Sequence, residues 1–228
     1  MPTVLLVRHA QASFGAAQYD ELSTLGHAQA ARLDEYLSER IHGPARLVAG
    51  TLRRQIDTAQ ACPRLRARGA PIERDTRWNE YDSADVLARH GPGPGAAGVS
   101  DIGAPPGLSN VAFQDVLDRA LQAWVAAGPD TSCAESWPAF RARSRAALDG
   151  VARDLGAGET AVVVTSGGVI AALVSGLLDA RPTGFVALNR MTLNTAVCTI
   201  LCGRSGLRLL SFGEHGHLGS ERALLTFR

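Results

Sequence analysis

An apolar segment near the N-terminus, Val4–Val7, runs directly into an arginine and a histidine, Arg8 and His9. Such a run of mostly β-favouring residues is typical of a strand that is buried on both faces, as in a parallel sheet. In open α/β sheets, ligands bind just beyond the carboxyl ends of these strands. We therefore expect Arg8 to meet an anion such as a phosphate or carboxylate, and His9 to act as a nucleophile or an acid–base group. Taken alone, the pair is equally consistent with a structural, hydrogen-bonded histidine.

The remainder of the chain alternates strand-like and helix-like segments, which predicts an α/β fold. We expect a three-layer sandwich with a mainly parallel central sheet and helices on both faces. Further strands are expected at Leu47–Ala49, Ile72, Ala161–Val164, Thr195–Cys202 and Leu207–Phe212. Helices are expected over 24–41, 52–61, 110–127, 137–155 and 169–178, with Thr51 and Ser136 as N-caps.

Glycine and proline cluster between Tyr81 and Ser109, as in His90–Gly95 and Gly103–Gly107. These residues break helices and strands. We interpret residues 1–228 as a single domain and residues 81–130 as an insertion that forms a flap over the strand ends. The apolar stripe of its helix, from Phe113 to Val125, is typical of core packing.

Composition excludes several classes of function. A formal net charge of +1 over 228 residues does not favour nucleic acid as a partner. No apolar run is long enough for a membrane span, and no leader is recognisable, so we expect a cytoplasmic protein that does not bind membranes. The four cysteines lack paired metal spacing, so we expect reduced thiols and no metal.

Three further segments point to the same chemistry as Arg8 and His9. Arg53 and Arg54 follow the second strand, Glu80 lies in a Trp-Asn-Glu-Tyr segment, and a small-residue turn at 165–168 opens an apolar helix. Such a turn offers backbone N–H groups and a positive dipole end to an anion. Together these groups suit phosphoryl transfer to an imidazole, with arginines holding the phosphate oxygens and a carboxylic acid protonating the leaving oxygen. The arginines supply the positive charge, so neither a metal nor a cofactor is expected.

This pattern resembles the histidine phosphatase superfamily, the phosphoglycerate-mutase-like proteins, over nearly the whole chain. Residues 6–10 are similar to its Arg-His-Gly signature, with Ala10 in the glycine place, and residues 51–59 to its second-arginine motif. The resemblance implies that His9 is phosphorylated and that Glu80 is the proton donor. It also implies that Arg8, Arg54 and Gly167 bind phosphate, and that Arg53 points away from the site.

The chain departs from that family at two positions. Ser166 stands where the family has a second histidine before Gly-Gly, and Gly15 where mutase-like members have an asparagine. A serine hydroxyl donates a hydrogen bond without adding charge, and loss of one preorganised donor costs on the order of 3 kcal/mol of transition-state stabilisation. We therefore expect a metal-independent phosphatase and keep Ser166 as a phosphate ligand. The alternatives are a phospho-ligand-binding or regulatory protein with weak turnover and, disfavoured by Gly15, a phosphoglycerate-type mutase.

The substrate is expected to be a small phosphorylated molecule or the phosphate ion itself. Gln11, Ser13 and Phe14 are candidates for the mouth of the site. His215 and His217 lie in a polar C-terminal segment and are either surface histidines or residues that fold back over the site and partly replace the missing imidazole. Neither the identity of the substrate nor the oligomeric state is readable from these patterns.

Overall fold

The computed structural model describes residues 1–13, 20–67, 71–91 and 110–227. Its centre is a six-stranded sheet in the order β3-β2-β4-β1-β5-β6. The strands are β1 (Thr3–Arg8), β2 (Ala45–Ala49), β3 (Glu73–Arg74), β4 (Thr160–Thr165), β5 (Val197–Gly203) and β6 (Gly206–Glu214). The first four are parallel to one another, whereas β5 is antiparallel to β1 and β6 to β5. The expected α/β fold with a mainly parallel sheet is confirmed.

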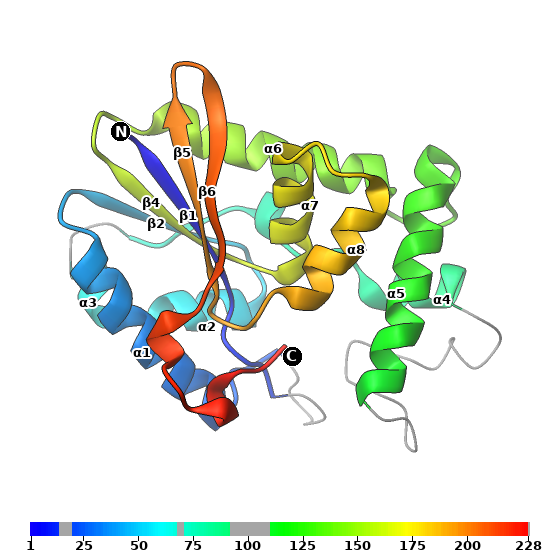
Figure 1. The fold of residues 1–228 in the computed structure, drawn as a ribbon, viewed down its shortest axis with the longest axis horizontal. Coiled ribbons are helices and arrows are strands. Elements are labelled where there is room, and N and C mark those ends of the chain that lie inside the picture. Colours follow the sequence, from blue (N-terminus) through cyan, green and yellow to red (C-terminus); the bar gives the residue numbers. More distant parts are fainter. Residues whose placement is uncertain (14–19, 68–70, 92–109, 228) are drawn as a thin grey trace.

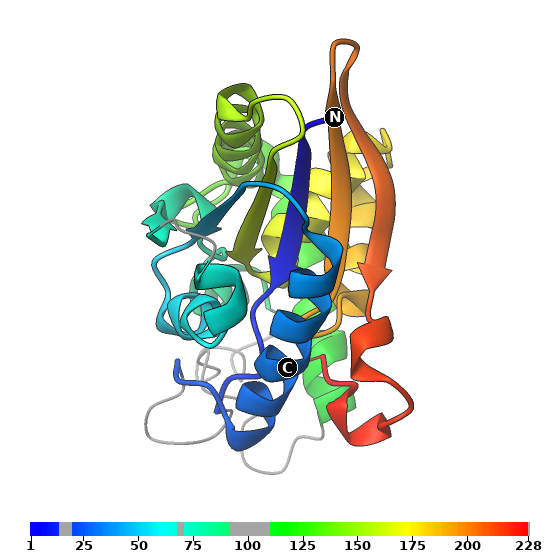
Figure 2. The same cartoon turned by 90° about the vertical axis from the view of Figure 1, so that its left-hand side faces the viewer.

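Helices cover both faces of the sheet, as Figure 1 and the turned view in Figure 2 show. On one side lie α1 (Thr24–Arg40), α2 (Arg53–Gln60) and α3 (Pro63–Arg66). On the other lie α6 (Trp137–Asp154), α7 (Gly167–Leu177) and α8 (Pro182–Met191). Beyond α8, α4 (Ser83–His90) and α5 (Asn110–Ala127) pack against each other, and α5 also contacts α8. These two helices flank residues 92–109 of the expected insertion, which lie outside the described residues.

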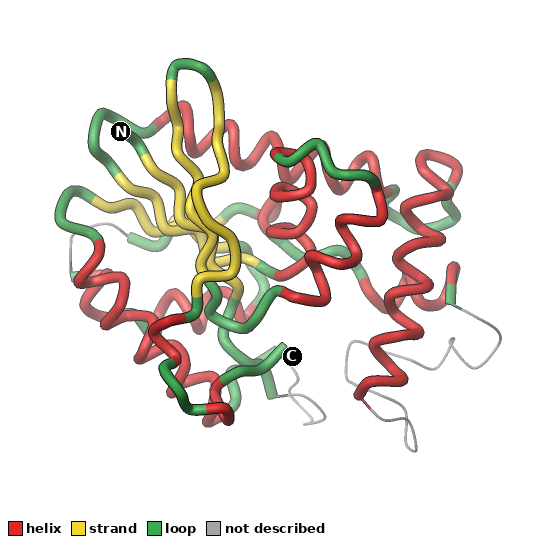
Figure 3. The backbone as a smooth tube through the Cα atoms, in the orientation of Figure 1, coloured by secondary structure: helices red, strands yellow, loops and turns green. Residues whose placement is uncertain are grey.

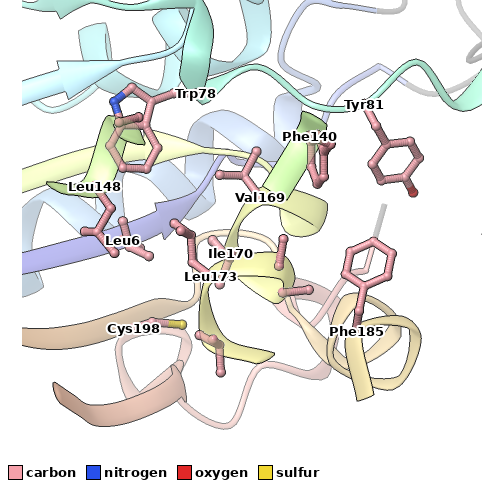
Figure 4. Packing of buried hydrophobic residues seen from close by; sticks show 14 of the residues in the cluster. Leu6, Trp78, Tyr81, Phe140, Leu148, Val169, Ile170, Leu173, Phe185 and Cys198 are labelled. Carbon is pink, nitrogen blue, oxygen red and sulfur yellow. The ribbon is translucent and has the colours of Figure 1, made fainter. Parts of the chain in front are cut away.

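Strand β1 shows why two helical layers form. Its side chains alternate between the faces. Leu6 joins the core beneath α6 and α7, which includes Ile170 and Trp78, whereas Leu5 and Val7 join the core beneath α1. Figure 4 shows Leu6, Trp78 and Ile170 in the larger core, with the aromatic rings of Tyr81, Phe140 and Phe185 at its other end. A strand whose central residues are all apolar therefore contributes side chains to the hydrophobic cores on both faces of the sheet.

The structure differs from the expected elements at several points (Figure 3). Strand β3 is Glu73–Arg74 rather than Ile72, because it pairs with only the last residues of β2. Helix α2 begins at Arg53 with Leu52 as its N-cap; Thr51 instead exchanges hydrogen bonds with the Asn79 side chain. Ser136 caps α6 as expected, since its Oγ accepts a hydrogen bond from the Ala139 N–H at 3.3 Å.

Helices α4 and α8 were not expected from the sequence. Asp82 caps α4 by accepting a hydrogen bond from the Asp85 N–H, and Pro182 opens α8. Across the described ranges, no helix is long and apolar enough to cross a bilayer. All four cysteines are free thiols.

Candidate active site

The parallel strands bring distant parts of the chain to one edge of the sheet. Arg8 at the end of β1 is in register with Thr165 at the end of β4, and the His9 N–H donates to the Thr165 carbonyl at 2.8 Å. The Gly50 N–H, just past β2, donates to Val164 at 3.1 Å. His9 and the starts of α2 and α7 therefore meet at the carboxyl ends of β1, β2 and β4, where open α/β sheets bind ligands.

His9 is held with one ring nitrogen directed at the site. Its side chain is nearly buried, and Nδ1 lies 2.8 Å from the Ala10 carbonyl oxygen. Because a carbonyl only accepts, Nδ1 carries the proton and Nε2 carries a lone pair. The Arg54 Nε–H donates to this Nε2 at 3.1 Å. Burial, together with the positive charges of Arg54 and Arg8, lowers the pKa of His9 well below its ordinary value, which keeps the imidazole neutral.

Arg54 is aimed by an acidic residue from another segment. Its Nη1 donates to Asp20 Oδ1 at 2.5 Å, while Asp20 Oδ2 accepts the Arg53 N–H at 2.6 Å. One carboxylate thus caps the start of α2 and orients the guanidinium at the same time. The Arg53 side chain points outward and forms ion pairs with Glu21 and Asp57. Of the two adjacent arginines, Arg54 therefore faces the cavity and Arg53 does not.

Arg8 spans the gap between the sheet and the C-terminal segment. Its guanidinium donates to the Thr192 carbonyl and, at 2.7 Å, to the Phe227 carbonyl. It lies against the first turn of α7, where a Cβ on Gly167 would be 3.5 Å from Arg8 Nε. The guanidinium and the N-terminus of α7 therefore add their positive potentials on the same side of the site.

Glu80 reaches the site from the loop before α4. Its Oε2 accepts the Gly168 N–H at 2.9 Å and its Oε1 the Tyr81 N–H at 3.2 Å. Burial raises the pKa of Glu80, against the opposing effects of the Gly168 amide and of Arg54 and Arg8. A raised pKa favours the protonated acid, the form that can deliver a proton. The Gly168 amide is committed to this carboxyl group rather than to an anion.

Ser166 is not brought to the cavity. It is fully buried, and its Oγ accepts a hydrogen bond from Gln55 Nε2 at 2.9 Å. The same Gln55 Nε2 donates to the Trp78 carbonyl at 3.0 Å. The serine thus joins α7 to α2 and to the segment that carries Glu80.

Gln11 and Ser13, which were expected at the mouth of the site, are not among the described residues that line the cavity. Gln11 accepts a hydrogen bond from the Ser23 hydroxyl, and the Ser13 N–H donates to the Glu21 carbonyl. Of the described residues in this loop, Ala12 lines the cavity, and Phe14 lies outside the described residues.

The two C-terminal histidines do not reach the cavity. His217 stacks on Tyr36, with 5.2 Å between ring centroids, and its Nε2 lies 3.1 Å from Thr195 Oγ1. Exposed His215 contacts the Gly213 carbonyl. Neither ring can replace an imidazole at residue 166 from these positions, so the fold-back alternative does not hold in this structure.

Arg8, His9, Arg54 and Glu80 share one cavity. Its described lining comprises Arg8, His9, Ala12, Arg54, Glu80, Tyr81, Ser83, Phe113, Gln114, Leu117, Gly167, Asn189, Arg190 and Phe227. A neutral imidazole, two guanidiniums and a carboxyl group of raised pKa therefore converge on one hollow. This arrangement suits the transfer of a phosphoryl group to nitrogen.

The sequence matches the family model of the histidine phosphatase superfamily (branch 1) over residues 4–91 and 100–215. The chain belongs to this superfamily. The match extends over the first strand, both arginine segments, Glu80 and the start of α7. No match was found among the curated proteins with which the sequence was compared.

Solved structures share the fold of this superfamily member. Phosphoserine phosphatase from Entamoeba histolytica, a mutant in complex with phosphoserine, is 19% identical with a TM-score of 0.67, over 96% of this chain and 100% of that one. YhfR from Bacillus stearothermophilus is 20% identical with a TM-score of 0.69, over 96% and 100%. A mycobacterial glucosyl-3-phosphoglycerate phosphatase in complex with inorganic phosphate is 26% identical with a TM-score of 0.61, over 94% and 98%.

Sequence reasoning missed several groups that surround the superfamily's motif residues. Asp20 orients Arg54 from a loop that carries no recognisable pattern. Asn189 and Arg190 come from α8, and the Asn189 Nδ2–H donates to the Tyr81 hydroxyl at 3.3 Å. An available signal was Pro182, since proline is favoured in the first turn of a helix.

Proposed function

We propose that this protein is a metal-independent phosphatase that hydrolyses a phosphomonoester through a phosphohistidine on His9. The observation that carries the proposal is the state of the imidazole. Ala10 fixes the proton on Nδ1, and Arg54 lies against the Nε2 lone pair. The lowered pKa of His9 keeps Nε2 unprotonated, so that it can attack phosphorus once the hydrogen bond from Arg54 passes to the phosphate.

The reaction then proceeds in two displacements. In the first, His9 Nε2 forms a bond to phosphorus while the bond from phosphorus to the ester oxygen breaks, and Glu80 gives its proton to that oxygen, which leaves as an alcohol. In the second, water attacks phosphorus, the N–P bond breaks, and the carboxylate of Glu80 takes up the proton of the water. Enzyme and acid return to their starting states, with alcohol and phosphate as products.

The positive groups stabilise the charge on the transferring phosphoryl oxygens. Arg54 is next to the nucleophile, and Arg8 lies beside Gly167 at the start of α7. Guanidinium groups suit this role because their planar fork matches phosphate oxygens. Ser166 could bind the phosphate only if its hydroxyl gave up the hydrogen bond from Gln55.

The buried position of Ser166 also supports a second candidate, a phospho-ligand-binding or regulatory protein with weak turnover. A site that lacks the charge of a second imidazole still attracts phosphate through Arg8 and Arg54. Such a protein would bind phosphate or a phosphate ester but would hydrolyse the ester only slowly. Gly15, in place of asparagine, continues to disfavour a mutase.

Steady-state hydrolysis of phenyl phosphate separates the two candidates. We expect phosphate release by the unaltered protein and by His27→Ala, a control at an exposed histidine of α1, but not by His9→Ala. Equal rates for His9→Ala and His27→Ala would overturn the phosphohistidine mechanism. Saturable phosphate binding without any turnover would favour the binding protein instead.

A further inference from the structure

The cavity also has walls that the proposed chemistry does not use. Its walls come from α5, through Phe113, Gln114 and Leu117, from α8, and from Phe227 in the C-terminal segment. Glu80 is the proposed donor to the leaving oxygen, and Tyr81, the next residue, is hydrogen-bonded to Asn189 of α8. Because Glu80 would protonate the leaving oxygen, the proposed mechanism turns the organic part of a phosphomonoester toward the walls that adjoin Tyr81 and α8.

Among the described residues, one cation, Arg190, lines this part of the cavity. Its positive charge is offset by two carboxylates of α5. Its Nη1 donates to Asp115 Oδ1 at 2.8 Å and to Asp118 Oδ2 at 2.7 Å. Gln114 also donates to Asp118, through Nε2 at 2.7 Å. Arg190 lines the cavity, and its two carboxylate partners on α5 give the three groups together a net negative charge, which disfavours a carboxylate on the leaving group.

Of the residues that the structure describes, those in the remaining wall of this part of the cavity are apolar or polar without charge. Phe113 and Leu117 are buried, and Phe227 presents an aromatic ring that is about half exposed. An alcohol with an aryl or alkyl face would bury apolar surface here, whereas a carboxylate would lose water and meet only a guanidinium that is already paired with two carboxylates.

We infer that the Asp115–Asp118–Arg190 cluster selects uncharged leaving groups and excludes carboxylated ones, so that the substrate class is phosphomonoesters of uncharged, partly apolar alcohols. The inference rests on the proposed function for its orientation of the substrate. It sets this chain apart from the Entamoeba relative, which was crystallised with the carboxylated ester phosphoserine.

Two matched esters test the charge selection directly. Glycerol 3-phosphate and 3-phosphoglycerate differ in having a hydroxymethyl group or a carboxylate at the far carbon. We expect kcat/KM to favour glycerol 3-phosphate by roughly tenfold or more, and phenyl phosphate to exceed both. In the double variant Asp115→Asn/Asp118→Asn, Arg190 is left positive, and the preference should move toward 3-phosphoglycerate by roughly tenfold.

Controls identify the group responsible. Asp149→Asn removes a carboxylate from an exposed ion pair with Arg145 on α6, and should leave the preference unchanged. Adding Arg190→Ala to the double variant should abolish the gain with 3-phosphoglycerate. Thermal melts establish that each variant is folded.

Binding of the same two esters to His9→Ala protein, measured by calorimetry, separates this inference from the proposed function. Absence of turnover in the unaltered protein, combined with tighter binding of glycerol 3-phosphate, would refute the phosphatase and uphold the selection. Preference of the unaltered protein for 3-phosphoglycerate would overturn the selection, and so would a folded double variant that shows no gain with 3-phosphoglycerate in kcat/KM or in affinity.

Discussion

Gly168→Ala tests the placement of the proposed acid without touching the acid itself. A Cβ at this position would lie 2.2 Å from Glu80 Oε1 and 2.5 Å from Tyr81 Cε1, whereas ordinary contacts begin at 3.4 Å. The Glu80 carboxyl group must therefore retreat by about 1 Å from the start of α7. Displacements of about 1 Å from productive geometry cost roughly 10²-fold in rate. We expect a loss of that size for an ester whose alkoxide leaves poorly, because such an ester depends most on the acid.

The assay compares ethyl phosphate with 4-nitrophenyl phosphate, whose leaving group needs little protonation. The loss should be large for the first ester and small for the second. Gly176→Ala, in the same helix, is the matched control: its Cβ would be 3.8 Å from the nearest atom, Arg141 Nη2, so activity should be retained. Equal losses with both esters would refute the reasoning, and so would an unchanged rate with ethyl phosphate in a folded variant.

The remaining predictions concern the acid, the nucleophile and the serine. Glu80→Gln should lower kcat with ethyl phosphate by about 10²- to 10⁴-fold and with 4-nitrophenyl phosphate far less; uniform losses would argue against an acid role. The pH profile of kcat/KM should rise as His9 loses its proton, at a pH below its ordinary pKa of 6.5, and fall as Glu80 loses its proton, at a pH above its ordinary pKa of 4.5. The falling limb should vanish in Glu80→Gln, and its persistence there would contradict the assignment. Ser166→His should raise kcat by up to about 10²-fold if the imidazole turns from Gln55 into the cavity, and a lower rate in a folded variant would show that the serine is tuned to its present contact.

The sheet and the reactive groups on it were largely predictable from the sequence. The apolar run at Val4–Val7 and its partner at Ala161–Val164 pair in register, as expected of buried parallel strands. Arg8 ends β1, His9 follows it, and Arg54 lies in the first turn of α2 shortly after β2, so the strand ends determine where the three residues meet. Strong local patterns of this kind survive because the tertiary structure reinforces them.

The surroundings of these groups were not predictable, because they depend on contacts between segments that are far apart in the chain. Asp20 is paired with Arg54, which lies 34 residues further along the chain. The burial of Ser166 depends on Gln55, 111 residues away. Helix α8 carries no long apolar stripe, with only Phe185 and Val186 buried, so its periodicity is weak.

The central claim is that His9 Nε2 accepts phosphorus. Rapid quenching of the protein under alkaline conditions during turnover of phenyl phosphate, followed by peptide mass spectrometry and ³¹P–¹⁵N NMR, locates the phosphoryl group. The account predicts one phosphoryl group on Nε2 of His9, absent from His9→Ala. Turnover without a phosphorylated histidine, or a phosphoryl group on any other residue or on Nδ1, would contradict it.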